Sequence, residues 1–596
     1  MLLAWLLLAF AAVACSDYRF GVNDQAQYLV HLIQLERPGV FVDDPYLASF
    51  AALRSGFWRP IAWFTDEATR PEAFLLITGC ITLCNVVLVT LVSAGLREPN
   101  SKLRLSTLRL VDLAPASVLV TPKEQNWFGL VGLSDVELTA TFAVTPLVFV
   151  VILAAVRAQL VIAWSAALLA CVLHAQTGAF LLASLWAWTL LSRPRTPLAI
   201  AGLSVSAALG VAALLWLRSV WALPSDLVED YQRIGTALFA ELLDPLSAPV
   251  RSWGGVILVV LLGVGVGIVR RWTGERETNA TDRPVIRLEQ WGVASAALPV
   301  MVLPLHALSL NEPVLWKLMT GRAMMLPMIA ALVLFAWFCG RLLDRGGLRA
   351  GFAWLALAAV AVWSFPGMSI GSAVVGVVLV AGGVLAASRP RQASEVEFRR
   401  PGGWAHFSVI VLCLGLGLLG LTRFQSRPFP WLRSAADTAW IEAQQWARAN
   451  TPPDALFVTP PDLSGWRTES HRSTVGELLD GGLLFFAGEP LLAWERRMQL
   501  LGIEEPAWRT FTAAERAEQH AAYRAAITER RTLERLGDEY GRTPEFVVAR
   551  TPWPFSRPPI WNNERFAVWA LPIYPGPRET AAGASPALGI FHEEQP

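Results

Sequence analysis

The stretch that decides the fold is FLLITGCITLCNVVLVTLVSAGL, residues 74–96, which carries no charged side chain. A helix of about 20 apolar residues is long enough to cross a bilayer. Similar uncharged runs occur at Thr139–Val156 and Val256–Val269. Across the chain 54% of the residues are hydrophobic and 16% are charged, whereas soluble domains carry about 25% charged residues. The sequence therefore predicts a polytopic α-helical membrane protein.

About thirteen apolar segments are candidate transmembrane helices. They lie at residues 1–15, 73–96, 107–120, 139–156, 159–173, 177–191, 198–216, 252–269, 290–310, 322–340, 351–364, 367–387 and 404–422. The first segment ends in Ala-Val-Ala-Cys, which is similar to a lipoprotein cleavage box. No basic residue precedes it, and the leucine usual three positions before the cysteine is missing. We therefore interpret residues 1–15 as a short first span rather than as a cleaved signal.

Arginine and lysine fall in every second connection between these segments. The basic connections contain Arg97, Lys102, Arg104 and Arg109; Arg157; Arg193 and Arg195; Arg270, Arg271, Arg276, Arg283 and Arg287; Arg341, Arg345 and Arg349; and Arg389, Arg391, Arg399 and Arg400. Such residues concentrate in cytoplasmic loops. The alternation predicts that the N-terminus is cytoplasmic and that everything after residue 422 is extracytoplasmic.

The chain divides into a predicted transmembrane domain, 1–422, and a soluble domain, 423–596. Outer loops of the transmembrane domain are expected at 16–72, 121–138 and 217–251. The second domain is charged and rich in proline and tryptophan, and it contains no apolar run of transmembrane length. Its patterns predict helices at 435–450 and 513–536 and strands at 455–459 and 546–548. We expect an α/β extracytoplasmic domain.

Charge and cysteine content narrow the possible functions. The formal net charge is +1, which gives no support for binding nucleic acid. The six cysteines all lie in or beside apolar runs, which favours packing roles over disulfides or a metal site. They are Cys15, Cys80, Cys84, Cys171, Cys339 and Cys413.

Polar residues in the first outer loop are candidate site residues. In a helix, Asp24 and His31 share a face, next to an apolar face that begins with Val22 and Ala26. Such a helix is expected to lie along the membrane surface. Farther on, the pair Asp43 and Asp44 precedes an aromatic segment, and we include both among the candidate substrate-binding residues.

The second outer loop contains Asp135 and Glu137, immediately before a predicted span. In an extended segment, alternate carboxylates lie on one side and can bind one divalent cation. Acidic residues also stabilise the N-terminus of a following helix. The spacing leaves both interpretations open.

Two further ionisable residues lie at the outer ends of predicted spans. His174 interrupts an apolar run in the segment HAQTG, where a ligand-facing histidine and a buried, hydrogen-bonded histidine both fit. Arg322, in GRAMMLP, lies where the basic bias predicts no arginine. It is suited either to bind a phosphate bidentately or to extend towards lipid headgroups.

In this layout the chain resembles the GT-C membrane glycosyltransferases, and most closely the catalytic subunits of oligosaccharyltransferases. The shared features are an acid after the first span, a D-x-E pair in the second outer loop, about thirteen spans and an outer C-terminal domain. The segment TPPDALFVTPPD at 451–462 resembles the start of the soluble domain of such proteins. The pieces GVNDQ, HAQTG and GRAMMLP also resemble a group of bacterial multi-pass proteins of this type.

The resemblance implies a transferase that uses a sugar carried on a polyprenyl phosphate or pyrophosphate, at the outer face of the bacterial cytoplasmic (inner) membrane. Asp24 would be the catalytic carboxylate, Asp135 and Glu137 would bind a divalent cation such as Mg²⁺ or Mn²⁺, and Arg322 would contact the lipid-linked phosphate. The Trp-Trp-Asp signature of oligosaccharyltransferases is absent. The most similar segment of this sequence, DLSGWRTESHRS at 462–473, has a single tryptophan, Trp466. The acceptor expected is therefore a glycan or lipid.

Two other functional classes fit the composition. A non-catalytic scaffold or glycolipid-binding protein would keep the same architecture without turnover. A transporter fits less well, because the predicted spans do not divide into two matching halves and no inverted repeat is visible.

Overall fold

The protein is described here from a computed structural model. The described residues are 1–97 with gaps at 17, 19, 22, 42, 48–49 and 51–55, then 108–119, 138–192, 227–243, 283–307, 325–345, 435–503 and 513–571, with isolated residues between 204 and 212 and between 351 and 421. These residues are mostly helical, with one small sheet in the C-terminal region.

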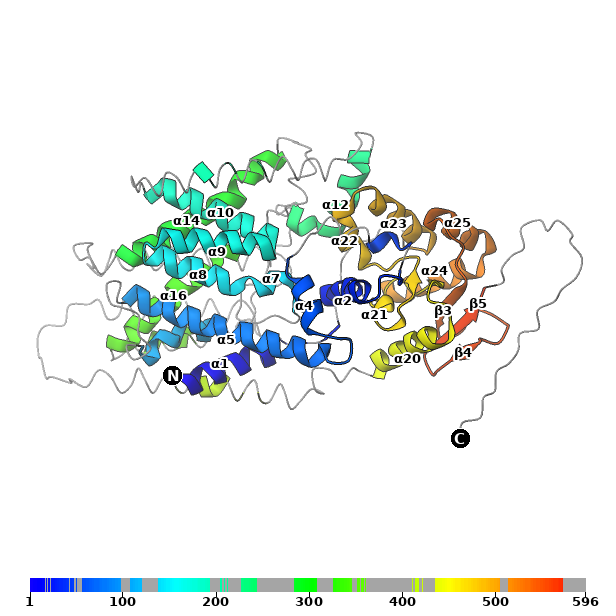
Figure 1. Cartoon of the computed structure of the whole chain (residues 1–596), viewed down its shortest axis with the longest axis horizontal. Coiled ribbons are helices and arrows are strands. Elements are labelled where there is room, and N and C mark those ends of the chain that lie inside the picture. Colours follow the sequence, from blue (N-terminus) through cyan, green and yellow to red (C-terminus); the bar gives the residue numbers. More distant parts are fainter. Residues whose placement is uncertain are drawn as a thin grey trace, which may run out of the picture.

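Apolar helices form a bundle in the first part of the chain (Figure 1). They are α1 (Leu2–Cys15), α5 (Arg70–Arg97), η2 (Leu110–Leu113), α6 (Ala114–Val118), α7 (Ala140–Ala143), α8 (Thr145–Val156), α9 (Leu160–Leu173), α10 (Ala175–Ser192), α14 (Arg283–Ala307) and α16 (Met325–Arg345). Two of these described helices, α5 and α16, are long and apolar enough to cross a membrane, and α1, residues 140–156 and α9 are shorter apolar helices.

The predicted segment at 107–120 is not one continuous helix. Its described part forms two short helices, η2 and α6, which are too short to cross a bilayer. Asp112 lies in η2, is buried, and accepts a hydrogen bond from Arg97 at 2.7 Å. The predicted spans at 198–216, 252–269, 351–364, 367–387 and 404–422 lie wholly or largely outside the described residues.

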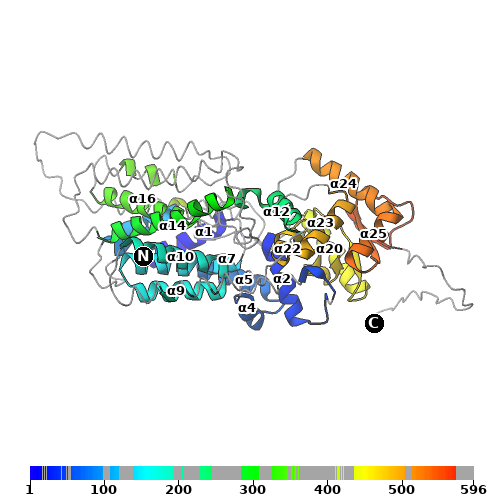
Figure 2. The same cartoon turned by 90° about the horizontal axis from the view of Figure 1, so that it is seen from above.

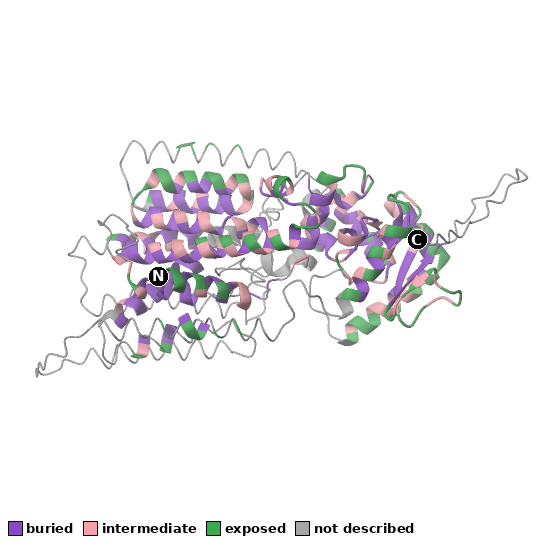
Figure 3. Ribbon diagram, turned by 60° about the horizontal axis from the view of Figure 1, so that its bottom comes forward, coloured by how far each residue is buried: buried purple, intermediate pink, exposed green. Residues whose placement is uncertain are grey.

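Several helices of the bundle expose large apolar side chains on their outer faces (Figure 3). Leu76 is 68% exposed, Val172 63% and Val161 57%. At the end of α4 (Trp58–Phe64), Trp63 and Phe64 are 77% and 84% exposed. Water penalises the exposure of large apolar side chains such as these. A lipid environment removes that penalty.

Basic residues gather at the end of the bundle that lies away from the C-terminal domain. Helices α5 and α8 both run towards that end (Figure 1). Arg97, the last residue of α5, pairs with Asp112. Arg287 donates a hydrogen bond to the carbonyl of Val156, the last residue of α8, at 3.0 Å. These arginines belong to connections that the sequence analysis assigns to the cytoplasm.

Three helices lie between the bundle and the C-terminal domain (Figure 2). They are α2 (Asn23–Glu36), α4 and α12 (Val228–Leu243). Arg233 of α12 donates hydrogen bonds to Glu495 of the C-terminal domain at 2.5 and 2.7 Å. The described parts of the segments predicted as the first and third outer loops therefore both lie at the end of the bundle that carries the C-terminal domain.

The C-terminal domain is of the predicted α/β type. Its elements are α20 (Ala435–Asn450), β1 (Leu456–Val458), α21 (Trp466–Ser470), β2 (Ser473–Thr474), α22 (Asp480–Ala487), α23 (Glu489–Leu500), α24 (Ala513–Thr528), α25 (Arg530–Tyr540), β3 (Phe546–Arg550), β4 (Trp561–Asn562) and β5 (Phe566–Ala570). The sheet has the order β2-β1-β3-β5-β4, with β1 parallel to β2 and β3 and the remaining pairs antiparallel.

The predicted elements of this domain are confirmed with one change. The helix at 435–450 coincides with α20, and β1 and β3 contain the predicted strand residues. Strand β1 is fully buried, as expected for a short apolar strand inside a sheet. The predicted helix at 513–536 is divided, because Glu529 has an extended backbone between α24 and α25.

Candidate functional site

Helix α2 connects the bundle to the C-terminal domain through two glutamines. The side-chain amide of Gln25 donates to the carbonyl of Leu138 at 3.5 Å, next to α7. The amide of Gln27 donates to the carbonyl of Leu479 at 2.6 Å, next to α22. Leu29 and Ile33 of the predicted apolar face are buried. Helix α2 is therefore packed between the two parts of the molecule.

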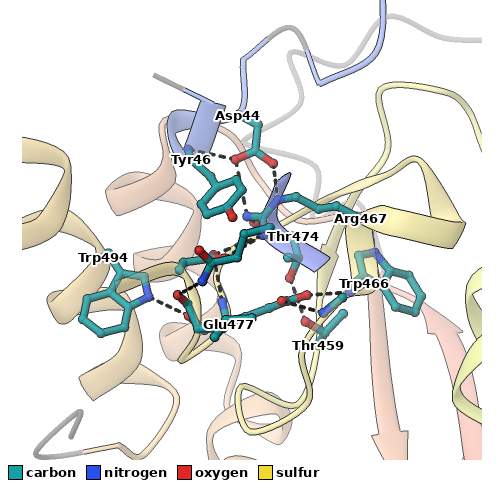
Figure 4. A network of polar contacts seen from close by, with 12 residues as sticks. Asp44, Tyr46, Thr459, Trp466, Arg467, Thr474, Glu477 and Trp494 are labelled. Atoms are coloured by element: carbon teal, nitrogen blue, oxygen red, sulfur yellow. Dashed lines mark hydrogen bonds and ion pairs between the residues drawn. The ribbon is translucent and has the colours of Figure 1, made fainter. Parts of the chain in front are cut away.

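A buried ion network joins the first loop to the C-terminal domain, and we call it the Arg467 cluster (Figure 4). Its members are Asp44, Tyr46, Arg467, Thr474, Glu477 and Asp480. Nε of Arg467 lies 2.7 Å from a carboxylate oxygen of Asp44, and Nη1 lies 3.0 Å from Asp480. Both ion pairs are at most 3% exposed. The guanidinium also lies over the ring of Tyr46, 4.5 Å from its centre.

The Arg467 cluster is held together by opposing charges in a dry environment. Burial disfavours the charged form of Arg467, but Asp44, Asp480 and Glu477 raise its pKa well above the usual value. Burial and the neighbouring Asp480 raise the pKa of Glu477 to about 8. The Glu477 carboxyl accepts hydrogen bonds from the backbone N–H groups of Gly465 and Trp466 at 2.9 and 2.7 Å. This cluster has the properties of a structural clasp.

A cavity of about 910 Å³ lies beside the clasp, at the junction of α2, α5, α20 and α21. Its apolar wall includes Phe20, Leu29 and Ile33. Its polar wall includes residues from the end of α2, the start of α5 and the C-terminal domain, namely Glu36, Arg37, Asp66, Glu67, Arg70, Gln445, Thr468 and Glu469. Small-molecule sites typically combine such apolar walls with a few convergent polar groups.

The most highly connected charge on the polar wall is Glu67, and we call its surroundings the Glu67 cluster. Its members are Arg37, Glu67, Arg448 and His471. Arg448 binds both carboxylate oxygens of Glu67, one of them at 3.1 Å. Arg37 donates to the same carboxylate at 3.1 Å. Burial disfavours the charge on Glu67, but the hydrogen bond from Arg448 and the charges of Arg448 and Arg37 keep its pKa below the usual value.

His471 has an unusual backbone and an unsatisfied nitrogen. Its φ of 51° places it in the left-handed region, which is strained for a residue with a side chain. Arg37 lies 3.2 Å from Nδ1, which therefore acts as acceptor, so the proton is on Nε2. Nε2 is buried without a hydrogen-bond partner among the described residues and lies 3.6 Å from Glu67. Burial, followed by Arg448, lowers the pKa of His471 to about 4.

A second arginine–carboxylate pair lies on the same wall. Arg70 at the start of α5 donates to Glu36 at the end of α2. The side chain of Arg70 is 2% exposed, and its Nε has no hydrogen-bond partner within the part of the chain that the structure describes. Burial raises the pKa of Glu36 against the opposing effect of Arg70. This pair adds no net charge to the cavity.

The candidate residues of the first outer loop differ in burial and in the side chains that they contact. Asp24 is the second residue of α2, and its side chain lies outside what the structure describes. His31 is half-buried and stacks on Phe50 with 4.8 Å between ring centres, and burial followed by Arg59 lowers its pKa. Asp43 is exposed. Asp44 is committed to Arg467, a role that its sequence position did not predict.

His174 is hydrogen-bonded on both ring nitrogens. Nδ1 lies 2.8 Å from the hydroxyl of Thr177, and Nε2 lies 3.3 Å from that of Thr141. Of the two interpretations left open by the sequence, these contacts favour the hydrogen-bonded histidine, which ends α9 and positions it against α7 and α10.

Asp135, Glu137 and Arg322 lie outside the described residues. In the described part of the chain, no group of three or more His, Cys, Asp or Glu side chains is arranged to hold a metal ion. The predicted cation ligands, Asp135 and Glu137, are therefore not among the residues for which the structure gives a geometry.

Sequence reasoning missed Arg37, Glu67, Arg70, Arg448 and His471 as site residues. One signal was present: Asp66 and Glu67 directly precede a predicted span, in the same way as Asp135 and Glu137. The arginines gave no such signal, because Arg448 is separated from Glu67 by 381 residues.

Comparison with known families assigns a short segment only. Residues 438–501 match a domain of unknown function, DUF6798. This segment runs from α20 to the end of α23 and contains Arg448, Arg467, His471 and Glu477. No curated protein matches the chain.

Proposed function

We propose that the protein is a membrane glycosyltransferase that moves a sugar from a polyprenyl phosphate or pyrophosphate carrier to a glycan or lipid acceptor, at the outer face of the bacterial cytoplasmic membrane. The observation that carries this proposal is the cavity at the junction. An apolar wall of Phe20, Leu29 and Ile33 faces a charged wall that includes Glu67 and Arg70. A ligand with an isoprenoid tail and an anionic, sugar-bearing head needs both kinds of wall.

The position of the cavity in the fold supports a lipid-linked ligand. It borders α5, a helix that meets the length and hydropathy of a span. Trp63 and Phe64 of α4 precede this helix and are highly exposed, as aromatic residues at a membrane interface are. We propose the predicted topology of about thirteen spans with the basic connections in the cytoplasm. The cavity then opens at the extracytoplasmic end.

Contacts around α2 support the proposed role of Asp24. Gln25, the neighbour of Asp24, is hydrogen-bonded to Leu138, the neighbour of Glu137. The two outer loops that the family resemblance assigns to catalysis are thus in contact through described residues. We propose that Asp24 accepts the proton of the acceptor hydroxyl and that Asp135 and Glu137 hold a divalent cation. Arg322 remains proposed as a contact of the carrier phosphate.

The transfer has a simple balance of bonds. The acceptor oxygen attacks the anomeric carbon and forms the new glycosidic bond, while the bond from that carbon to the phosphate oxygen breaks. The phosphate leaves with the electron pair, and the acceptor proton passes to a base. Positive groups near the departing phosphate stabilise its charge in the transition state.

A non-catalytic glycolipid-binding function is the second candidate, and one observation favours it. Two carboxylates on the described cavity wall, those of Glu36 and Glu67, are engaged by arginines. A carboxylate held in this way is a poor general base. The two candidates differ in whether bound carrier is turned over.

The test is a transfer assay with the purified full-length protein in detergent. A radiolabelled sugar on a polyprenyl phosphate is supplied with membrane glycans and lipids as acceptors. We expect the sugar to leave the carrier, and Asp24→Asn to reduce this rate at least 100-fold, while Glu539→Gln, in an ion pair of the C-terminal domain that does not line the cavity, retains it. Saturable binding of the carrier with no release of sugar by the wild type would contradict the transferase and support the glycolipid-binding protein.

A further inference from the structure

The Glu67 cluster carries more positive than negative charge. Two guanidinium groups, Arg37 and Arg448, converge on one carboxylate. His471 is neutral near pH 7, because burial lowers its pKa to about 4. The cluster therefore has a surplus of one positive charge after Glu67 is counted, at the edge of a cavity large enough for a ligand.

The donors of this cluster are incompletely used. Nε2 of His471 is buried, carries a proton and has no hydrogen-bond partner among the described residues. It points near the Glu67 carboxylate, 3.6 Å away, which is beyond hydrogen-bond distance. A buried donor without an acceptor costs free energy. An oxyanion with more oxygens than a carboxylate would satisfy it.

The position of the Glu67 side chain allows it to move away from its basic partners. Its side chain is 33% exposed, and it lies in the loop between α4 and α5 rather than in a helix. Of its basic partners, Arg37 is 48% exposed and Arg448 33%, whereas His471 is 2% exposed. Nε2 of His471 is therefore fixed in position, and the carboxylate beside it is accessible to solvent.

We propose that Arg37, Arg448 and His471 form a binding site for a phosphate group, and that the carboxylate of Glu67 occupies this site until the phosphate displaces it. Arginine pairs bind phosphate oxygens with short, charge-assisted hydrogen bonds. Nε2 of His471 donates a third hydrogen bond. Glu67 thereby competes with the ligand for the same donors.

The rest of the cavity restricts where the phosphate binds. Asp66 and Glu469 also line the cavity, and the Glu36–Arg70 pair is neutral. These carboxylates repel an anion, so the Glu67 cluster is the favourable position for it. The apolar wall then receives the hydrocarbon part of the ligand. That the phosphate belongs to a lipid carrier rests on the proposed function, whereas the binding of a phosphate at the Glu67 cluster does not.

The C-terminal domain offers a matched control pair. Arg496 and Glu539 form an ion pair at 2.8 Å with exposures of 53% and 31%. The corresponding values for Arg37 and Glu67 are 3.1 Å, 48% and 33%. The same substitution therefore removes the same charge at a similarly exposed position in the two pairs. Of the two, only the Arg37–Glu67 pair borders the cavity.

The experiment measures equilibrium binding of a polyprenyl monophosphate to the full-length protein in detergent, with the polyprenol of the same length as the uncharged probe. We expect Glu67→Gln to bind the phosphate about tenfold more tightly and Arg448→Gln about tenfold more weakly. Arg37→Gln, at an exposed position, provides a second weakening variant in case Arg448→Gln does not fold. Glu539→Gln and Arg496→Gln should bind as the wild type does.

Competition with inorganic phosphate distinguishes a site for a free phosphate from a site that needs the polyprenyl chain. Displacement of the lipid by inorganic phosphate in the wild type, strengthened by Glu67→Gln, supports a phosphate site. Equal binding of polyprenol and polyprenyl phosphate, or unchanged binding in both Glu67→Gln and Arg448→Gln, overturns it. Sugar transfer that proceeds with unchanged phosphate binding in these variants refutes the site and leaves the transferase standing. Phosphate binding as expected without sugar transfer refutes the transferase and leaves the site standing.

Discussion

The Arg467 cluster and the Glu67 cluster both pair arginine with carboxylates, but they differ in burial and in how completely their groups are paired. Arg467 is 3% exposed and bonded to two carboxylates and to the carbonyl of Thr474. Glu67 is 33% exposed, and a nitrogen of His471 beside it is buried without a hydrogen-bond partner among the residues that the structure describes. A fully paired, fully buried network holds two parts of the chain together, whereas a partly exposed and incompletely paired network can exchange partners with a ligand.

The largest expected effect comes from removing the cation of the clasp. Arg467→Met leaves Asp44 and Asp480 buried without a counter-ion, which should lower the free energy of unfolding by about 3–5 kcal/mol. The measurement is denaturant unfolding of the purified protein in detergent. Arg496→Met, which breaks an exposed pair, should cost less than about 1 kcal/mol. Equal losses in the two variants would show that the Arg467 cluster is no clasp.

The next effect is a pH dependence of the clasp. The pKa of Glu477 is about 8 in the folded protein and close to 4.5 when unfolded, so between these values the folded state binds the extra proton. Stability should therefore fall as pH rises from 6.5 to 8, by at most about 1.4 kcal/mol per pH unit. Glu477→Gln should make this part of the profile flatter. Identical pH profiles for the variant and the wild type would contradict the raised pKa.

The smallest expected effect on stability lies in the cavity. Glu67→Gln weakens ion pairs that are a third to a half exposed, which should change the free energy of unfolding by less than about 1 kcal/mol. Glu539→Gln should give a change of the same size. A loss of 3 kcal/mol or more in Glu67→Gln alone, comparable with Arg467→Met, would mean that the Glu67 cluster is structural as well.

Local patterns in the sequence predicted some of the helices and strands of the C-terminal domain, but not α21–α23, β2, β4 or β5. The helix at 435–450 and the strand at 455–459 were recognisable because their apolar spacing depends on neighbouring residues alone. The division at Glu529 was not recognisable, since the residues on both sides continue a helical pattern. In the apolar region, hydropathy located the described helices α5, α8 and α9 but did not reveal that residues 110–118 form two short helices.

The described residues that line the cavity include none of the candidate residues chosen from the sequence. The sequence analysis placed candidates in the first and second outer loops and at the outer ends of two spans, and the first of these loops lines part of the cavity. It did not find the partners of Asp44 and Glu67, because Arg467 and Arg448 lie 423 and 381 residues away along the chain. Ion pairs between remote segments leave no periodic pattern. Only folding brings these residues together.

The most direct test of the central claim is to map where a lipid-linked phosphate binds. A polyprenyl phosphate that carries a photoreactive group on its first isoprene unit is bound to the full-length protein in detergent and crosslinked, and the labelled peptides are identified. We predict labelling of α2 around Leu29 and Ile33 and of the segment 65–71, with stronger labelling in Glu67→Gln. Labelling confined to other parts of the chain, unchanged by Glu67→Gln, would contradict the account.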